Sequence, residues 1–193
     1  MANSPKILVF AGSARSASFN KKLAAAAAGM ARDAGAEVTL LDLADHRLAM
    51  YDGDDEAGGG VPADAKALRK IFLDHDAMII ASPEYNSSVA PMLKNTLDWI
   101  SRPDGDDAMV VAYKGKTAGL ISASPGALGG LRGLVHLRSI LGNIGVTVVP
   151  QQFAMSGASK GFSDDGSIAD EGQAGAVKAV VHAVVRTAGA LKG

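Results

Sequence analysis

Five short runs of apolar residues are spaced along the chain, and none of them alternates apolar with polar positions. The runs are Lys6–Phe10, Glu37–Leu43, Ala77–Ser82, Thr117–Ser124 and Val146–Phe153. Continuous apolar runs of this length are typical of strands that are covered on both faces, as in a parallel sheet between layers of helices. We therefore predict five buried parallel strands.

The segments between these runs carry apolar residues every three or four positions, the spacing of one face of a helix. Helices are predicted around Leu23–Ala34, Ala63–Leu73, Pro91–Ile100, Leu134–Ile144 and Val177–Leu191. Strands that alternate with helices predict an α/β fold with right-handed crossovers. With five strands, we expect a flavodoxin-like three-layer sandwich whose parallel sheet has the order 2-1-3-4-5, with helices on both faces.

The pattern contains no repeat and no second unit, so we expect residues 1–193 to form a single domain. Two polar stretches that contain glycine, Asp52–Gly60 and Ser159–Gly172, interrupt the pattern and are expected to be loops. An Asp-Gly pair at Asp165–Gly166 predicts a turn in the second loop.

The composition narrows the class of partner. Lys and Arg number 19 against 20 Asp and Glu, and no long basic run occurs, so electrostatics do not favour a nucleic-acid or membrane partner. The chain has no cysteine, which excludes a disulfide framework and a thiolate nucleophile. No signal-cleavage pattern and no run of about 18 apolar residues is present. We expect a soluble, cytoplasmic protein that binds a small molecule.

Three of the predicted loops follow the carboxyl ends of neighbouring strands. They are Gly12–Asn20 after the first strand, Ser82–Pro91 after the third and Ser124–Gly133 after the fourth. Ligands of an open α/β sheet bind at this edge, near the point where the strand order reverses. We therefore expect the three loops to converge on one site.

The first loop, GSARSASFN, suits a phosphate monoester. Gly12 permits a tight turn, the serines and Asn20 offer donors, Arg15 adds a positive charge, and the following helix adds free N–H groups. An equally compatible interpretation is that Ser18 or Asn20 only caps the helix and Arg15 is solvated. The loop lacks the second glycine and lysine of a P-loop and the further glycines of a dinucleotide-binding loop.

The other two loops have weaker signals when each is considered alone. Pro83–Asn86 can present backbone groups to the edge of a flat heterocycle, although a rigid turn explains it better. Small residues in Ser124–Gly133 would let a ring approach the backbone, or would simply make a flexible connection. Arg132 is expected to meet the anionic part of a second ligand or to be solvated.

The remaining polar residues do not form a catalytic set. Asp42 is interpreted as a loop cap, and the four histidines are not spaced as metal ligands and are expected to be structural or solvated: His46, His75, His136 and His182. No Gly-x-Ser-x-Gly nucleophile motif occurs. A site with phosphate donors but without an acid, base or nucleophile indicates that a cofactor carries the chemistry.

Three segments together resemble the NADPH-dependent FMN reductase family, in particular its quinone and chromate reductase branch. They are GSARSASFN, SPEYNSSVAPMLKNTLDWISR and GKTAGLISASPGALGGLRG. The resemblance covers nearly the whole chain and departs at Ala90–Pro91, where many relatives have Pro-Gly. It implies FMN as cofactor, NADPH or NADH as co-substrate, and a small electron acceptor such as a quinone, chromate, an azo compound or free flavin.

The resemblance also implies roles for individual residues. The FMN phosphate would be held by Ser13, Arg15, Ser18, Phe19 and Asn20, and the isoalloxazine and ribityl chain would contact Pro83, Glu84, Tyr85, Asn86, Ser124 and Gly126. No catalytic side chain is required, and a ping-pong cycle is expected because both substrates need the same flavin face. Relatives are typically dimers or tetramers, which would place Leu97 and Trp99 at an interface. A flavodoxin-type electron carrier that does not oxidise nicotinamides remains the alternative.

Overall fold

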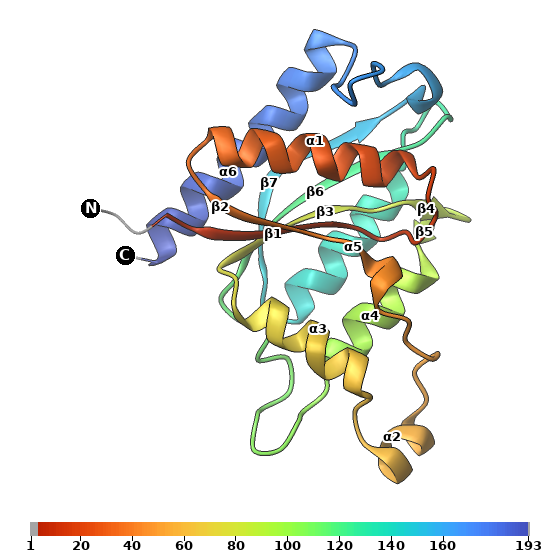
Figure 1. Cartoon of the computed structure of the whole chain (residues 1–193), viewed down its shortest axis with the longest axis vertical. Helices are drawn as coiled ribbons and strands as arrows, with labels where there is room; N and C mark the ends of the chain where they lie inside the picture. The colour runs from red at the N-terminus through yellow and green to blue at the C-terminus, as the bar shows by residue number, and fades with distance from the viewer. Residues whose placement is uncertain (1–3, 193) are drawn as a thin grey trace.

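A computed structural model describes residues 4–192, and its centre is a five-stranded parallel sheet (Figure 1). The strands lie in the order β2-β1-β3-β6-β7, which is the predicted order 2-1-3-4-5. Their bounds are Lys6–Ala11 for β1, Glu37–Leu41 for β2, Ala77–Ala81 for β3, Thr117–Ala123 for β6 and Thr147–Met155 for β7. The predicted fold class is confirmed. A small antiparallel hairpin of β4 (Glu84–Tyr85) and β5 (Ser88–Val89) was not predicted.

Helices cover both faces of the sheet (Figure 1). One face is covered by α1 (Phe19–Asp33) and α6 (Glu171–Lys192). The other is covered by α3 (Ala63–Leu73), α4 (Pro91–Ser101) and α5 (Leu131–Asn143). Short helical segments are η1 (Leu43–Asp45), α2 (Gly53–Gly59) and η2 (Ala158–Lys160).

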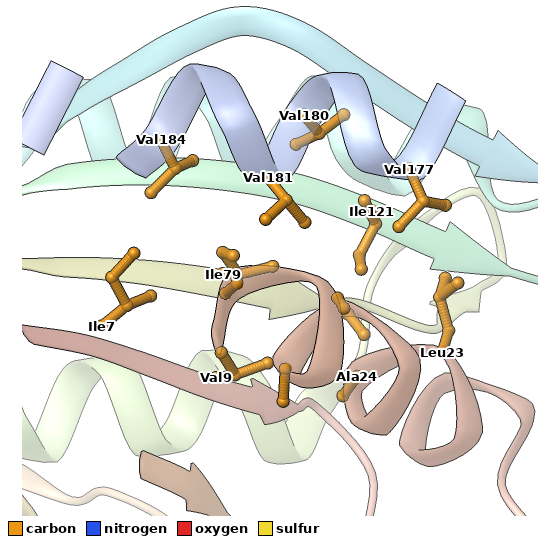
Figure 2. Packing of buried hydrophobic residues seen from close by; sticks show 14 of the residues in the cluster. Ile7, Val9, Leu23, Ala24, Ile79, Ile121, Val177, Val180, Val181 and Val184 are labelled. Atoms are coloured by element: carbon orange, nitrogen blue, oxygen red, sulfur yellow. The ribbon is translucent and has the colours of Figure 1, made fainter. Parts of the chain in front are cut away.

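The core on the α1 and α6 side is a layer of branched aliphatic side chains (Figure 2). Val177, Val181 and Val184 of α6 are fully buried against the central strands. A Cβ added to Gly119 of β6 would lie 2.5 Å from Val184 Cγ2, so this glycine lets α6 pack directly on the sheet. Replacement of this glycine by any larger residue would push the helix away.

Within residues 4–192, α6 is the one helix that is long and apolar enough to cross a membrane, judged by length and composition. The mean hydropathy of its most apolar 18-residue window is 1.2. The sequence contains no uninterrupted apolar run of that length, because charged residues interrupt the apolar positions of this helix. Charged residues such as Lys178 and Arg186 lie on the exposed side of this helix, while its valines are in the core. The helix is therefore a core helix of this fold.

Two predictions about exposure and loops are wrong. β2 is not covered on both faces: it lies at the edge of the sheet, and Leu40 is 46% exposed. The stretch Asp52–Gly60 is not a loop, because it contains α2. Asp52 begins this helix by accepting a hydrogen bond from the Asp54 N–H (2.8 Å). The second predicted loop is largely irregular, and its Asp-Gly turn is present, with Gly166 at φ 85°.

The expected interface role of Leu97 and Trp99 is also wrong. Each is only 2% exposed within its own chain. The indole N–H of Trp99 donates to the Ala49 carbonyl (2.9 Å), and its ring meets Tyr51 edge to face at 5.0 Å. These side chains therefore anchor the segment before α2 and leave no surface for a partner.

Candidate functional site

The three loops singled out from the sequence leave from adjacent strands at one edge of the sheet, on the side opposite the chain termini (Figure 1). Sheet-like backbone hydrogen bonds continue past the strands into each loop. The N–H groups of Gly12, Ser82 and Ser124 donate to the next strand at 2.9, 2.9 and 3.0 Å. The loops therefore start at fixed points, and the predicted convergence is present.

The first loop forms a cradle of backbone N–H groups. Ser18 is the N-cap of α1: its hydroxyl accepts from the Lys21 N–H at 3.4 Å, and its own N–H donates to the Arg15 carbonyl. Within residues 4–192, the N–H groups of Ser16, Ala17, Phe19 and Asn20 have no protein acceptor. Unpaired N–H groups at the positive end of a 15-residue helix favour an anion.

Two polar side chains of this loop are already engaged by the protein. The Asn20 amide donates to the Ala123 carbonyl (2.9 Å) and accepts from the Ala123 N–H (3.0 Å), which ties α1 to the end of β6. The Ser13 hydroxyl accepts from the Arg15 N–H at 3.3 Å. These contacts shape the loop, while the Arg15 side chain is exposed at its surface.

The second loop is the hairpin of β4 and β5. Its two central residues, Asn86 (φ 50°) and Ser87 (φ 67°), both lie in the left-handed region. A two-residue turn of this kind matches the twist of paired strands, although it costs a serine about 1 kcal/mol. Tyr85 is 47% exposed, so it is not the core tyrosine that a simple rigid turn would contain. A strained turn and an exposed ring are features of a binding surface.

Glu84 clamps the hairpin to the first turn of α5. Its carboxylate accepts from the Gly133 N–H at 2.9 Å and from the Arg132 guanidinium at 2.6 Å. The Glu84 side chain is 9% exposed, whereas Arg132 is 54% exposed. Burial raises the pKa of Glu84, but the Gly133 N–H and the Arg132 guanidinium outweigh burial and hold the pKa below its ordinary value. Glu84 is therefore ionised near neutral pH, and both of its carboxylate oxygens are occupied by hydrogen bonds from α5.

The third loop needs glycine because its backbone is left-handed at two positions and because neighbouring atoms leave no room for a Cβ there. Gly129 and Gly130 have φ of 62° and 95°, and a Cβ on Gly130 would lie 2.9 Å from the Ser122 side chain. The Ser122 hydroxyl donates to the Gly129 carbonyl at 2.8 Å, so this turn is held in place rather than flexible. A Cβ on Gly126 would approach only the Ser124 hydroxyl, at 3.6 Å. That position is open, and a flat ligand can approach the backbone there.

Sequence reasoning missed several residues that shape this edge. Ser122 and Gly133 lie within the third quoted segment, but their contacts with the Gly129 carbonyl and the Glu84 carboxylate cannot be inferred from the sequence. Asp42 was interpreted as a loop cap, which is confirmed: it accepts from the Ala44 N–H at 2.9 Å and begins η1. It also pairs with Lys21 of α1 at 2.7 Å.

The histidines have structural contacts. His75 lies between the Ile71 carbonyl (2.6 Å) and the Thr39 hydroxyl (2.8 Å), and so joins the end of α3 to β2. His136 of α5 contacts the Ser88 hydroxyl of the hairpin at 3.0 Å. These two contacts agree with the structural role expected for them.

The fold and the edge together define a class of protein. A doubly wound sheet of this order carries an anion cradle on its first loop, and a glycine-lined loop and a strained hairpin lie beside it. The cradle fits a terminal phosphate, and the open position at Gly126 fits a flat ring. The class is that of flavodoxin-like proteins that bind a mononucleotide such as FMN.

Comparisons with known proteins identify the family within this class. The chain matches the family of NADPH-dependent FMN reductases over residues 5–160 and belongs to it. It is 35% identical to a 2-hydroxy-1,4-benzoquinone reductase from a Burkholderia species, over 76% of this chain and 75% of that protein. It is 34% identical to a quinone reductase of Escherichia coli K12, over 89% of each chain. The resemblance seen in the three loops is confirmed at the level of the family.

A solved structure supports the same conclusion. FerB, a flavoenzyme NAD(P)H:(acceptor) oxidoreductase from Paracoccus denitrificans, is similar to this chain with a TM-score of 0.81 and 30% identity. The similarity covers 95% of this chain and 97% of that one. The cradle, the hairpin and the glycine-lined loop therefore belong to a fold that is shared over its full length with a flavoenzyme.

Proposed function

We propose that this protein is an FMN-dependent NAD(P)H oxidoreductase that reduces a small acceptor, with quinones as the favoured class. The observation that carries the proposal is the convergence of three loops at one edge, where unpaired N–H groups at the α1 N-terminus lie beside the exposed Arg15. Relatives named for quinone and FMN reduction support the same activity. Chromate, azo compounds and free flavin remain further candidate acceptors.

The cradle would hold the phosphate of FMN. The free N–H groups of the first loop and the Arg15 guanidinium supply donors and positive charge, while the side chains of Ser13, Ser18 and Asn20 fix the shape of the loop. The free N–H groups are those of Ser16, Ala17, Phe19 and Asn20. Phe19, which is partly buried, packs on the core directly behind the cradle. A charge-assisted hydrogen bond from arginine to phosphate adds both affinity and orientation.

The hairpin and the third loop would hold the isoalloxazine and the ribityl chain. Pro83, Tyr85 and Asn86 border one side, and Ser124 and Gly126 border the other. In this arrangement Glu84 positions the hairpin through its backbone, because its carboxylate is bonded to Gly133 and Arg132. The clamp keeps the hairpin in one position, so the protein does not have to order it when the cofactor binds.

The chain itself orients the reactants and excludes water at this edge. When bound, FMN supplies the hydride-acceptor chemistry between a reduced nicotinamide and the final acceptor. Glu84 cannot serve as a proton donor near neutral pH because its carboxyl is ionised and fully engaged. Positioning by the three loops is therefore the main contribution of the protein to the reaction.

The experiment that tests the proposal is a visible spectrum. The protein is incubated with FMN, desalted, and then mixed anaerobically with NADPH or NADH. Retained yellow colour that bleaches with either nicotinamide is the expected result. Colour that persists with both would indicate an electron carrier instead, and a colourless protein that also fails to bind FMN in a titration would refute the proposal.

We also propose a homodimer or homotetramer in solution. Three hydrophobic residues are exposed near the hairpin: Leu128 (50%) in the third loop, and Leu131 (42%) and Val135 (56%) at the start of α5. Apolar side chains gathered on one exposed strip favour association between copies. Light scattering of the purified protein gives the oligomeric state directly, and a mass equal to one chain would refute this proposal.

A further inference from the structure

A second cleft adjoins the first loop on the side of α4. It has a volume of about 440 Å³, within the usual range of small-molecule pockets. Its wall includes Ala14 of the phosphate cradle and Pro91, which begins α4 two residues after the hairpin ends. The rest of the lining comes from α4 and the segment 46–50. The cleft therefore adjoins the proposed flavin site at Ala14 but lies outside it.

The charge of this cleft favours an anion. The ionisable side chains among its described lining residues are His46 and Arg47, and none of the lining residues is a carboxylate. Thr96 also lines the cleft, where its hydroxyl adds a hydrogen-bond donor. The first turn of α4 adds the positive end of a helix at Pro91.

The apolar part of the lining suits a flat ring. Met50 is 70% exposed at the rim, and Leu48 and Met92 lie deeper in the cleft. The segment that carries Met50 is held on both sides, because the Asn95 side chain donates to the Ala49 carbonyl and accepts from the Tyr51 N–H, each at 2.8 Å. The wall is therefore fixed before a ligand arrives.

We propose that this cleft binds the adenosine diphosphate part of the reduced nicotinamide dinucleotide. Arg47 would contact the pyrophosphate, Thr96 would donate a hydrogen bond to it, and Met50 would lie against the adenine. The inference rests on the proposed function, which requires the nicotinamide ring to reach the neighbouring flavin edge. It adds an affinity determinant outside the three loops that hold FMN.

The test uses the FMN-loaded protein, with NADPH as donor, a benzoquinone as acceptor, and ADP as a probe of the cleft. Loss of a charge-assisted contact in Arg47→Ala is expected to raise the KM for NADPH by about tenfold or more, with kcat changed less than about twofold. Retention of FMN is expected to be unchanged. ADP is expected to inhibit the wild-type protein competitively with NADPH and to lose this effect in Arg47→Ala.

Two further variants sharpen the result. Thr96→Val removes the hydroxyl at nearly constant volume and is expected to raise the KM for NADPH without loss of FMN. Arg186→Ala removes an exposed arginine from α6, on the other face of the sheet, and is the matched control with an unchanged KM.

The outcomes separate this inference from the proposed function. Normal NADPH oxidation with an unaltered KM in Arg47→Ala would overturn the assignment of the cleft and leave the reductase activity intact. Loss of FMN in Arg47→Ala would also overturn it, because Arg47 would then belong to the flavin site. A wild-type protein that retains FMN but does not oxidise NADPH or NADH would instead overturn the proposed function, and ADP binding measured by calorimetry would still test the cleft.

Discussion

The clamp made by Glu84 allows a quantitative prediction, because its partners and its burial are both defined. Glu84→Ala removes a hydrogen bond from the Gly133 N–H to a carboxylate, a contact worth about 1.5–3 kcal/mol. It also removes the ion pair with Arg132, which adds at most about 1 kcal/mol since Arg132 is 54% exposed. We expect a total loss of about 1.5–4 kcal/mol in the free energy of unfolding. For a chain of this length, the loss corresponds to a decrease of about 3–16 °C in Tm.

The same substitution should weaken FMN binding if the clamp preorganises the hairpin. A hairpin that is no longer tied to α5 must be ordered when the cofactor binds, and the cost cannot exceed the free energy that the clamp supplied. Because each 1.4 kcal/mol is a factor of ten, the Kd for FMN should rise by between about fivefold and one hundredfold. Glu84→Gln keeps an acceptor for the Gly133 N–H and should lie between the wild type and Glu84→Ala in both measurements.

The assay combines thermal unfolding followed by circular dichroism with titration of FMN fluorescence. Asp76→Asn is the matched control, since Asp76 also accepts from a backbone N–H (Lys6, 2.7 Å) and pairs with a lysine (Lys192, 2.7 Å). It lies near the chain termini, at the opposite edge of the sheet from the three loops. The control should lose stability and keep its FMN affinity. If Glu84→Ala weakens FMN binding no more than Asp76→Asn does, the proposed preorganisation is wrong.

Four further predictions address the cradle, the third loop, the clamp and the kinetics. Arg15→Ala should raise the Kd for FMN by about tenfold to one hundredfold through loss of a charge-assisted bond, and an unchanged Kd by fluorescence titration would remove Arg15 from the phosphate site. Gly130→Ala should lower Tm by several degrees because its φ is 95° and its Cβ would meet Ser122 at 2.9 Å, whereas Gly126→Ala, with open space around it, should leave the Tm of the cofactor-free protein unchanged. The pKa of Glu84 is lower in the folded than in the unfolded chain, so the stability that its carboxylate contributes is complete above the ordinary pKa of 4.5 and is lost as the pH falls through the folded pKa. The difference in the free energy of unfolding between the wild type and Glu84→Gln, measured by urea unfolding, should therefore shrink below pH 4.5 and stay constant above it. Initial rates at several NADPH and quinone concentrations should give parallel double-reciprocal lines, and intersecting lines would contradict a ping-pong cycle.

The strands could be predicted because each is a continuous apolar run of five residues or more, and the main helices because their apolar residues recur every three or four positions. The loops of the candidate site could be located for the same reason, since the strand order fixes which loops meet. The hairpin could not be predicted. Its strands have two residues each, Glu84–Tyr85 and Ser88–Val89, which is too short for any alternation to be visible. Its turn uses Asn86 and Ser87 instead of the usual Asn-Gly pair, so the strongest local signal was also missing.

Contacts between residues far apart in the sequence account for the other errors. Trp99 was expected at an interface because relatives of the family are typically dimers or tetramers. In the structure the partner of its indole N–H is the Ala49 carbonyl, which lies 50 residues earlier. Side-chain contacts of Glu56 explain why α2 exists in a glycine-rich stretch: Tyr51 donates to Glu56 at 2.8 Å, and Glu56 accepts from Arg102 at 2.8 Å. Tertiary contacts of this kind outweigh the low helix propensity of glycine.

The segment 46–51, which forms one wall of the cleft beside α4, is held by side chains that lie outside the three loops. The second family segment includes Asn95 and Trp99, but none of the three segments includes residues 46–51, which these two side chains hold in place. A sequence comparison that reads only the three loops would therefore assign FMN and remain silent about the nicotinamide dinucleotide. If Arg47 determines the KM for NADPH, specificity for the electron donor resides in a segment held by long-range contacts. Substitutions at Asn95 that release Ala49 and Tyr51 should then raise the KM for NADPH even though Asn95 bears no charge, and their effect should be absent when Arg47 has already been replaced by alanine.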